Sequence, residues 1–393
     1  MKTAIMYGGG NIGRGFIGKV FADSGYEVCF LDIMQDIIDE MNARGQYTVR
    51  IVSNQDEQDT IVKPVRAVNS LTDQAIEEIV NCEIMATAVG VNVLPRIAPV
   101  IAKGIAARMK RTGRPLDIIL CENQLGADEL MRGWINEYLS DEQCAWADDN
   151  LGLVEASVGR MVPPLTPEMR AKDKLLICVE PYSDLPVDRD AFKGPIPYLK
   201  GLIPYSPFEF YIKRKLFLHN GGHALCAYLG YEKGCEYIWQ AIADPEIYEA
   251  ARASMMASAQ ALVEKFGEGV RMNVESNIAD LLFRFQNRAL KDTVARVGAD
   301  PVRKLRRNDR IVGAALFAIE QGVDPAPIVR GIVAALKFDR AEDSAAQEIQ
   351  TALKEKGIEY VLGYYMGLSP DEALCQMIID NEKMCAHNAE GKP

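Results

Sequence analysis

Histidine is scarce in this chain of 393 residues, which has only three. Its nine cysteines are scattered and never form a C-x-x-C pair. A zinc site needs several histidine, cysteine or acidic ligands that converge, so the composition disfavours a metal-dependent function. An odd number of widely spaced cysteines indicates reduced thiols, and we therefore expect a cytoplasmic protein without a disulfide framework.

Acidic residues outnumber basic ones, and the chain has no long apolar run. The net charge of −11 disfavours nucleic acid and membrane surfaces as partners, and it means that an anionic substrate needs a local basic pocket. No apolar run reaches the roughly 18 residues that a membrane-spanning helix requires. The first residues, MKTAIMYGGG, lead directly into a strand and a glycine turn, so we expect no signal peptide. Nothing in the sequence indicates an oligomeric state.

The chain is too long for one typical hydrophobic core, and its pattern changes near the middle. Strand and helix patterns alternate in the first half, whereas the pattern is helical almost throughout the second. Prolines and glycines cluster between them, over residues 181–207. We predict an α/β protein with a Rossmann-type domain, built on a mostly parallel sheet, followed by an all-α domain. The expected ranges are 1–190, 191–387 and a disordered tail at 388–393.

A glycine-rich turn near the N-terminus predicts a dinucleotide site. The motif G-x-G-x-x-G follows a short apolar run, and a second apolar run ends at Asp32. Such glycines let a pyrophosphate approach the backbone at a helix N-terminus, and Asp32 can accept hydrogen bonds from ribose hydroxyls. Asp32 would repel a 2′-phosphate, so NAD is favoured over NADP. The alternative is an ordinary glycine-rich turn. We expect the cofactor to contact Gly8, Gly10, Asn11, Ile12 and Gly13.

Two further strand ends add candidate cofactor contacts. The strand predicted at 83–87 leads into Ala88-Val89-Gly90, and the strand at 116–120 leads into Cys121-Glu122-Asn123. Residues just past the carboxyl ends of parallel strands lie where open α/β sheets bind ligands. We therefore predict that Thr87 and Val89 line the cofactor. Asn123 is either an amide donor near the nicotinamide or a helix cap.

The stretch from 213 to 230, KRKLFLHNGGHALCAYLG, carries the candidate catalytic groups. On a regular α-helix Lys215, Asn220 and His223 fall at roughly 0°, 140° and 80°, which is less than half of the circumference. Lys215, with its pKa lowered by burial or by neighbouring positive charge, would be the general base for a hydroxyl proton. Asn220 and Asn123 would donate to the developing alkoxide, and His223 would orient the substrate. The alternative is a lysine at a helix start and a core histidine.

Other interpretations of this stretch are weaker. Tyr211 and Lys215 fit the Y-x3-K pattern of short-chain dehydrogenases, but they lie far downstream of the glycine turn in a much longer chain. His219 and His223 have the spacing of a zinc pair, but HNGGH lacks the glutamate of H-E-x-x-H and no third ligand is evident. Gly221-Gly222 would allow a ligand to approach the backbone closely.

Basic residues gather over 303–310, against the acidic background of the chain. Arginine forks bind phosphate bidentately, so this cluster could clamp a phosphate or sugar hydroxyls. The alternative is a solvated helix end. The predicted substrate contacts are Arg160, Lys213, Arg303 and Arg310.

Several segments together resemble a known family. They are GGGNIGRGFIGKVFADSG, the TAVG loop, CEN, RMVPP, KRKLFLHNGGHALCAYLG and LKDTVARVGADPVRKL. They are similar to the polyol-specific long-chain dehydrogenases of the mannitol dehydrogenase family, over residues 1 to about 340, and GNIGRGFIG resembles the mannitol-1-phosphate 5-dehydrogenase branch.

This resemblance implies an extended Rossmann domain, an all-helical second domain, NAD and no metal. The family pattern K-x4-N-x2-H matches Lys215, Asn220 and His223, and its second asparagine matches Asn123. The implied reaction interconverts mannitol 1-phosphate and fructose 6-phosphate. The chain departs from the family pattern after CEN and over residues 308–330. A related polyol or hexonate substrate, as in mannitol 2-dehydrogenase or tagaturonate and fructuronate reductases, and an NAD-binding sensor without turnover are therefore the alternatives.

Overall fold

The chain folds into two compact units that meet in sequence between Glu209 and Phe210. The computed structural model describes residues 1–390, with side chains described to residue 383. The predicted boundary after residue 190 would separate two paired strands. The strand β10 (Leu185–Asp188) pairs in parallel with β11 (Leu202–Tyr205), and both belong to the first unit. Of the predicted tail, residues 388–390 belong to helix α19 (Ala373–Glu390), and 391–393 lie outside the described residues.

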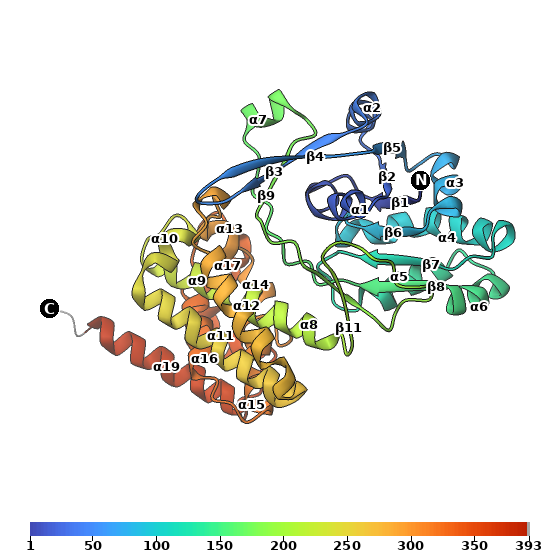
Figure 1. Cartoon of the computed structure of the whole chain (residues 1–393). Helices are drawn as coiled ribbons and strands as arrows, with labels where there is room; N and C mark the ends of the chain where they lie inside the picture. Colours follow the sequence, from blue (N-terminus) through green and yellow to red (C-terminus); the bar gives the residue numbers. More distant parts are fainter. Residues whose placement is uncertain (391–393) are drawn as a thin grey trace. The chain divides into compact units, whose positions relative to one another are not determined.

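A six-stranded parallel sheet organises the first unit (Figure 1). The strand order is β5-β2-β1-β6-β7-β8, and each neighbouring pair is parallel. The order reverses between β1 and β6, which is the point where doubly wound sheets bind dinucleotides at the strands' carboxyl ends. The strands are β1 (Thr3–Tyr7), β2 (Glu27–Asp32), β5 (Val65–Asn69), β6 (Ile84–Thr87), β7 (Leu116–Leu120) and β8 (Leu151–Glu155). The predicted α/β fold with a parallel sheet is confirmed.

Helices cover both faces of this sheet, and this explains why its strands are apolar on both sides. In β1, Ala4 and Met6 join the core formed with α1 and α2, whereas Ile5 and Tyr7 join the core formed with α3, α4 and α5. The helices of this unit are α1 (Gly18–Asp23), α2 (Gln35–Arg44), α3 (Asp73–Asn81), α4 (Leu94–Arg111), α5 (Ala127–Asn136), α6 (Asp141–Asn150) and α7 (Pro167–Lys172), with a π-turn η1 (Gly13–Ile17) and a 3-10 turn η2 (Val91–Val93).

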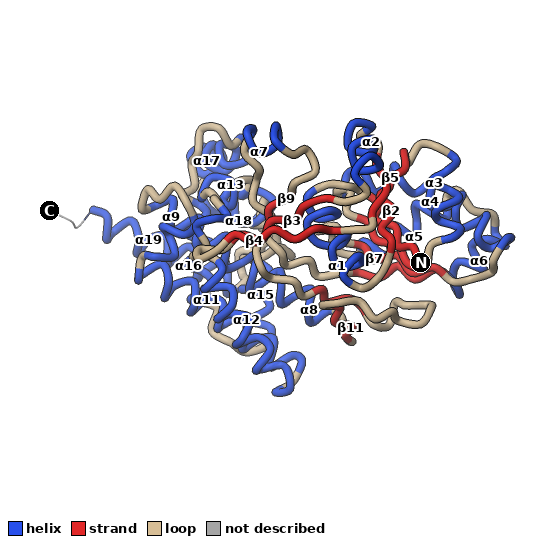
Figure 2. Tube along the Cα trace, turned by 45° about the horizontal axis from the view of Figure 1, so that its top comes forward, coloured by secondary structure: helices blue, strands red, loops and turns tan. Residues whose placement is uncertain are grey.

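A second, smaller sheet extends the core on the α1 side (Figure 2). The antiparallel hairpin of β3 (Tyr47–Val52) and β4 (Glu57–Val62) is joined by β9 (Ile177–Val179), which runs parallel to β3. The hydroxyl of buried Tyr47 donates to the carbonyl of Arg14 at 2.7 Å. The small sheet thus supports the helix that follows the glycine turn.

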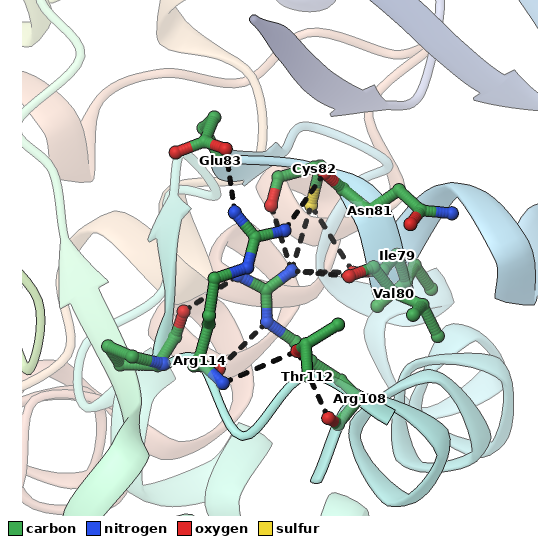
Figure 3. Close-up of polar contacts among 9 residues, drawn as sticks. Ile79, Val80, Asn81, Cys82, Glu83, Arg108, Thr112 and Arg114 are labelled. Atoms are coloured by element: carbon green, nitrogen blue, oxygen red, sulfur yellow. Dashed lines mark hydrogen bonds and ion pairs between the residues drawn. The ribbon is translucent and has the colours of Figure 1, made fainter. Parts of the chain in front are cut away.

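On the sheet face covered by α3, α4 and α5, one buried arginine links the ends of two helices to the start of β7 (Figure 3). Arg108, in the last turn of α4, is 1% exposed. Its guanidinium donates to the carbonyls of Ile79, Val80 and Cys82 at the end of α3, at 2.8–3.0 Å. It also donates to the carbonyls of residues 114 and 115, which lead into β7. A cation at a helix C-terminus favourably meets the negative end of the helix dipole.

The second unit is helical, as predicted. Its central helix, α9 (Gly221–Glu232), contacts α10, α11, α13 and α16, and it is buried from residue 224 to residue 230. Helix α8 (Glu209–Arg214) and a π-turn η3 (Lys215–Asn220) precede α9 without a break. The other helices are α10 (Ile238–Ala243), α11 (Pro245–Phe266), α12 (Arg271–Arg284), α13 (Val294–Gly298), α14 (Pro301–Lys304), α15 (Val312–Glu320), α16 (Ala326–Leu336), α17 (Ser344–Lys356) and α18 (Ile358–Tyr364), with 3-10 turns η4 (Glu268–Val270) and η5 (Arg288–Leu290).

Candidate active site

Of the three glycines in the motif, only Gly10 has open space where a Cβ would lie. Gly8 has a φ of +98°, and a Cβ there would lie 2.7 Å from the carbonyl oxygen of Ala88. A Cβ on Gly13 would lie 1.9 Å from the carbonyl oxygen of Gly8. A Cβ on Gly10, in contrast, would meet no atom within 4 Å. Gly8 and Gly13 are therefore required by the turn itself, and Gly10 is the position where a pyrophosphate can approach.

Asp32 is held in place at the carboxyl end of β2. One carboxylate oxygen accepts from the backbone N–H of Gly9 at 2.6 Å, and the other accepts from Ile33 and Met34 at 2.7 and 3.0 Å. These bonds fix the carboxylate beside the glycine turn, where the predicted ribose contact requires it. The residues of the first unit that were expected to bind NAD thus gather at one edge of the sheet, and they fit the ligand.

Two buried arginines donate hydrogen bonds to backbone carbonyls of this turn and of the helix that follows it. The Nε of Arg14 donates to the Gly9 carbonyl at 2.6 Å, and burial lowers the pKa of its guanidinium. Arg160 donates to the carbonyls of Glu180 and Gly15 at 3.0 and 3.2 Å and lies over the ring of Phe16. The structure therefore gives Arg160 contacts with the backbone of the glycine-turn helix, and its predicted contact with substrate stays a prediction.

Glu122 joins the ends of two neighbouring strands. Its carboxylate accepts from the hydroxyl of Thr87 at 2.7 Å and from the N–H of Val89 at 2.9 Å. Burial raises the pKa of this carboxyl, although both hydrogen bonds oppose the rise. Thr87 is fully buried, Val89 is half-buried and Asn123, the next residue after Glu122, is exposed. The sequence does not single out Glu122, although an acid directly after a buried apolar strand was a usable signal.

The candidate catalytic stretch is helical, but its central turn is of the π type and therefore wider than the predicted α-helix. Over Lys215–Asn220 the helix is of the π type, and the N–H of Gly221 bonds to the carbonyl of Leu216, five residues back. In such a turn residues five apart lie nearly above one another, as residues four apart do in an α-helix. The roughly 140° expected between Lys215 and Asn220 therefore narrows to about 40°. The correction brings Lys215, Asn220 and His223 closer to a single face.

The two glycines after this turn serve helix packing. A Cβ on Gly221 would lie 2.8 Å from the carbonyl oxygen of Arg310, and one on Gly222 would lie 2.7 Å from the sulfur of Met255. Protein atoms fill the space beside both glycines, so the expectation that a ligand approaches the backbone here is wrong. The same contact places the backbone of Arg310 beside the N-terminus of α9.

The two histidines of this stretch have different surroundings. His219 is buried, and burial first, then the charges of Arg284 and other cations, lower its pKa well below the ordinary value. His223 is half-buried, its ring stacks on Phe285, and its Nε2 lies 3.0 Å from Asp292 Oδ2. Asp292 is not predicted from the sequence, although it lies in the motif LKDTVARVG. Among the described residues no group of three or more His, Cys, Asp or Glu side chains is arranged for a metal ion.

Most predicted phosphate ligands have acidic or aromatic partners in the structure. The ammonium of Lys213 lies over the rings of Phe217 and Phe317. The Nε of Arg303 pairs with Asp300 at 3.0 Å, and the Nε of Arg310 pairs with Asp309 at 2.7 Å.

Two further cations of the same cluster are also engaged. Arg307 pairs with Glu372, and Lys304 is buried with its ammonium at the carbonyl of Ala299. Burial, together with Arg310 and Arg303, lowers the pKa of Lys304 to about 7. Neither residue extends the clamp expected from the sequence.

Comparisons with known proteins agree with this architecture. The family model described as the mannitol dehydrogenase Rossmann domain matches residues 2–201, and the mannitol dehydrogenase C-terminal domain matches residues 208–379. A D-sorbitol dehydrogenase structure shares the fold with a TM-score of 0.82 at 16% identity, covering 98% of this chain and 93% of that one. A Pseudomonas fluorescens mannitol 2-dehydrogenase complex with NAD and D-mannitol has a TM-score of 0.71 at 15% identity, covering 100% and 95%.

No helix among the described residues is both long and apolar enough to cross a bilayer. The two family models together account for most of the chain, from residue 2 to residue 379. Their order matches the two units, and the first unit holds the glycine turn, the acid after β2 and the strand order of a dinucleotide-binding sheet. The chain therefore belongs to the mannitol dehydrogenase family of NAD-dependent polyol dehydrogenases.

Proposed function

We propose that this chain interconverts mannitol 1-phosphate and fructose 6-phosphate without a metal ion. The observation that supports the proposal is the π-turn over Lys215–Asn220, since in ideal helix geometry such a turn brings Lys215, Asn220 and His223 toward one face. An amine, an amide and an imidazole on one face can surround a single hydroxyl-bearing carbon. NAD, when bound, accepts a hydride from that carbon. The chain's own residues deal with the proton and the oxygen.

Lys215 is the proposed general base that takes the proton of the secondary hydroxyl. Arg214 and Arg284 lie near the same buried region, where their charges and that of Lys215 act together on His219. Neighbouring positive charge of this kind is what the proposal requires for Lys215 to act as a base. Asn220 and Asn123 are the proposed donors to the oxygen as it gains negative charge, and His223 is the proposed contact for a neighbouring hydroxyl.

The phosphate part of the proposal rests on the basic cluster and on the resemblance of the glycine turn to the phosphate-using branch. Arg310 is the favoured ligand because its backbone packs against Gly221, close to the catalytic turn. Arg303 is about half-exposed, so its guanidinium can exchange Asp300 for a phosphate. Arg160 and Lys213 remain candidates. We also expect a cytoplasmic location, since the eight cysteines among the described residues are free thiols.

The first test follows NADH absorbance with mannitol 1-phosphate, mannitol and sorbitol 6-phosphate in parallel, with a chelator present. We expect rapid turnover on mannitol 1-phosphate alone. Lys215→Ala should abolish turnover while NAD still binds, which separates an enzyme from an NAD sensor. A wild-type protein that binds NAD and turns over none of these substrates would contradict the proposed reaction.

A second candidate is oxidation of an unphosphorylated polyol by the same residues. Two observations favour it: the cations of the basic cluster have internal acidic partners, and the two similar structures are named for mannitol and sorbitol. Turnover on free mannitol at a kcat/KM equal to or above that on mannitol 1-phosphate would establish it. In that case Arg310→Gln should leave kcat/KM nearly unchanged, whereas loss of a phosphate contact should lower it about 10- to 100-fold.

A further inference from the structure

The carboxylate of Asp292 contacts the imidazole of His223, one of the proposed catalytic residues. Its Oδ2 lies 3.0 Å from His223 Nε2, which is itself buried, and the contact lacks the alignment of a good hydrogen bond, so it is mainly electrostatic. The imidazole also stacks on Phe285, with centroids 4.7 Å apart and an interplanar angle of 11°. The ring is therefore restrained in both tilt and direction.

The position of this carboxylate is itself restrained. The Nε of Arg296 donates to Asp292 Oδ1 at 2.8 Å, so the two carboxylate oxygens have different partners. Along the backbone, the carbonyl of Asp292 accepts from Ile238 at 2.9 Å, and the N–H of Val294 donates to Glu236 at 2.9 Å. These bonds on either side of Asp292 hold the loop against the start of α10. Backbone hydrogen bonds on both sides of Asp292 thus keep its carboxylate next to His223.

The electrostatics favour a permanent negative charge at this position. The carboxylate is 10% exposed, and burial by itself raises its pKa. His223 and Arg296 more than offset burial, so the pKa of Asp292 lies below its ordinary value. The other titratable ring next to His223 is His219 on the same helix. Lys215, Arg214 and Arg284 are the cations around that second histidine.

We propose that Asp292 is a positioning residue that keeps the imidazole proton of His223 on Nε2 and leaves Nδ1 to accept a hydrogen bond from a substrate hydroxyl. The inference rests on the proposed polyol oxidation and deepens it. A neutral imidazole has one donor and one acceptor nitrogen, and the partner of one nitrogen decides the role of the other. A carboxylate at Nε2 attracts the proton there. A polyol hydroxyl is a suitable donor for Nδ1.

The tautomer can be measured without any substrate. In protein labelled with nitrogen-15 histidine, the chemical shifts of the ring nitrogens show which one carries the proton. The chain has only three histidines, so the signals of His223 can be assigned with a His223→Asn variant. We expect a protonated Nε2 in the wild type and a mixture of tautomers in Asp292→Asn. An unprotonated Nε2 in the wild type overturns the proposal, whatever the substrate proves to be.

Kinetics provide the second test. Asp292→Asn should raise KM for the polyol about 10- to 100-fold, the usual effect of losing a charged hydrogen-bond partner, while NAD affinity stays unchanged. Asp292→Glu should restore part of the loss. The matched control is Glu268→Gln, which removes a surface ion pair with Arg271 far from the proposed site in sequence.

The outcomes separate the two proposals. A wild type that oxidises polyols, combined with an Asp292→Asn variant of unchanged KM and unchanged tautomer, overturns the role of Asp292. A wild type that oxidises none of the substrates contradicts the proposed function, and the tautomer measurement still decides the role of Asp292. The urea midpoint of Asp292→Asn at the assay temperature shows whether the variant is folded. A folded variant without a tautomer change counts against the proposal.

Discussion

At the scale of single residues, acidic side chains at the C-terminal ends of the strands of the first sheet lead to testable predictions. Glu122 is the clearest, because its two oxygens hold the side chain of Thr87 and the backbone of Val89. Both partners belong to the strand end that is predicted to line NAD. Glu122 can therefore control the shape of the predicted NAD site through the loop that it anchors.

We predict that Glu122→Gln weakens NAD binding about tenfold, because the neutral amide accepts more weakly than a carboxylate and the Thr87 hydroxyl must turn to accept from the amide nitrogen if Val89 keeps the oxygen. Titration of the protein with NADH, followed by nucleotide fluorescence, gives the dissociation constant. Glu129→Gln, an exposed carboxyl on α5, is the matched control and should bind NADH as the wild type does. Equal affinity in Glu122→Gln and the control would show that the loop keeps its shape without this anchor.

Glu155, at the end of β8, predicts a pH-dependent stability. Burial, with repulsion from Asp128 and Asp188, raises its pKa to about 7 against an ordinary value of 4.5, although the N–H of Ala127 opposes the rise. The folded state therefore holds the proton more tightly than the unfolded chain does. Its contribution to stability is complete below about pH 4.5 and is lost as the pH rises through about 7.

Glu155→Gln should remove this loss while keeping an acceptor for the N–H of Ala127. The expected gain in unfolding free energy at about pH 8 is about 1–2 kcal/mol, after discounting the full shift because the side chain is partly exposed. At about pH 4 the variant and the wild type should be equal. Urea unfolding at both pH values, monitored in the first unit, measures the difference. A gain of the same size at both pH values would point to packing instead of titration.

At the scale of elements, Arg108 joins the end of α3 to the end of α4. Arg108→Met keeps the apolar stem but leaves five carbonyl groups without their donor, so we expect a loss of about 3–5 kcal/mol. Arg111→Met, in the same turn, removes an exposed ion pair with Glu77, which water and salt screen, and should cost far less than Arg108→Met. Urea unfolding compares the two variants, and equal losses would refute the role of the carbonyl contacts.

The π-turn of the helix that carries the candidate catalytic residues leads to a second prediction at this scale. Gly221→Ala pushes a methyl group against the Arg310 carbonyl, which must move together with the turn. We expect kcat/KM to fall at least about tenfold, since catalytic groups tolerate little misplacement, while NAD affinity stays unchanged. The control is Gly133→Ala in α5, where a Cβ meets nothing within 4 Å and alanine should stabilise the helix. Wild-type kcat/KM in Gly221→Ala would mean that the turn adapts.

The sequence predicts local features well and long-range ones poorly. The glycine turn, the four strands β1, β2, β6 and β7 and the helices of the second unit follow from spacing and apolar periodicity within short windows, whereas β5 is not predicted. The hairpin of β3 and β4 does not, because β4 is exposed and charged at Glu57 and Asp59 and reads as a loop. The partners of Glu122 lie up to 35 residues away, and Gly221, at the end of the π-turn, packs against the backbone of Arg310, which is 89 residues away. Such contacts are absent from any short window.

At the scale of the whole molecule, the two units have separate internal packing, and NAD is assigned to the first. Ligand binding stabilises whatever state it binds, by about 2.7 kcal/mol at a concentration of 100 times the dissociation constant. We therefore predict that NAD alone slows amide hydrogen exchange mainly within residues 1–209, most strongly at the glycine turn and the Val89 loop. Adding the polyol should extend protection to the turn at Lys215–Asn220. Hydrogen exchange with mass spectrometry resolves both segments, with Lys215→Ala as the control that binds NAD without turnover. Protection of both units by NAD alone would mean that the cofactor couples them before substrate binds, and the assignment of NAD to the first unit would then need revision.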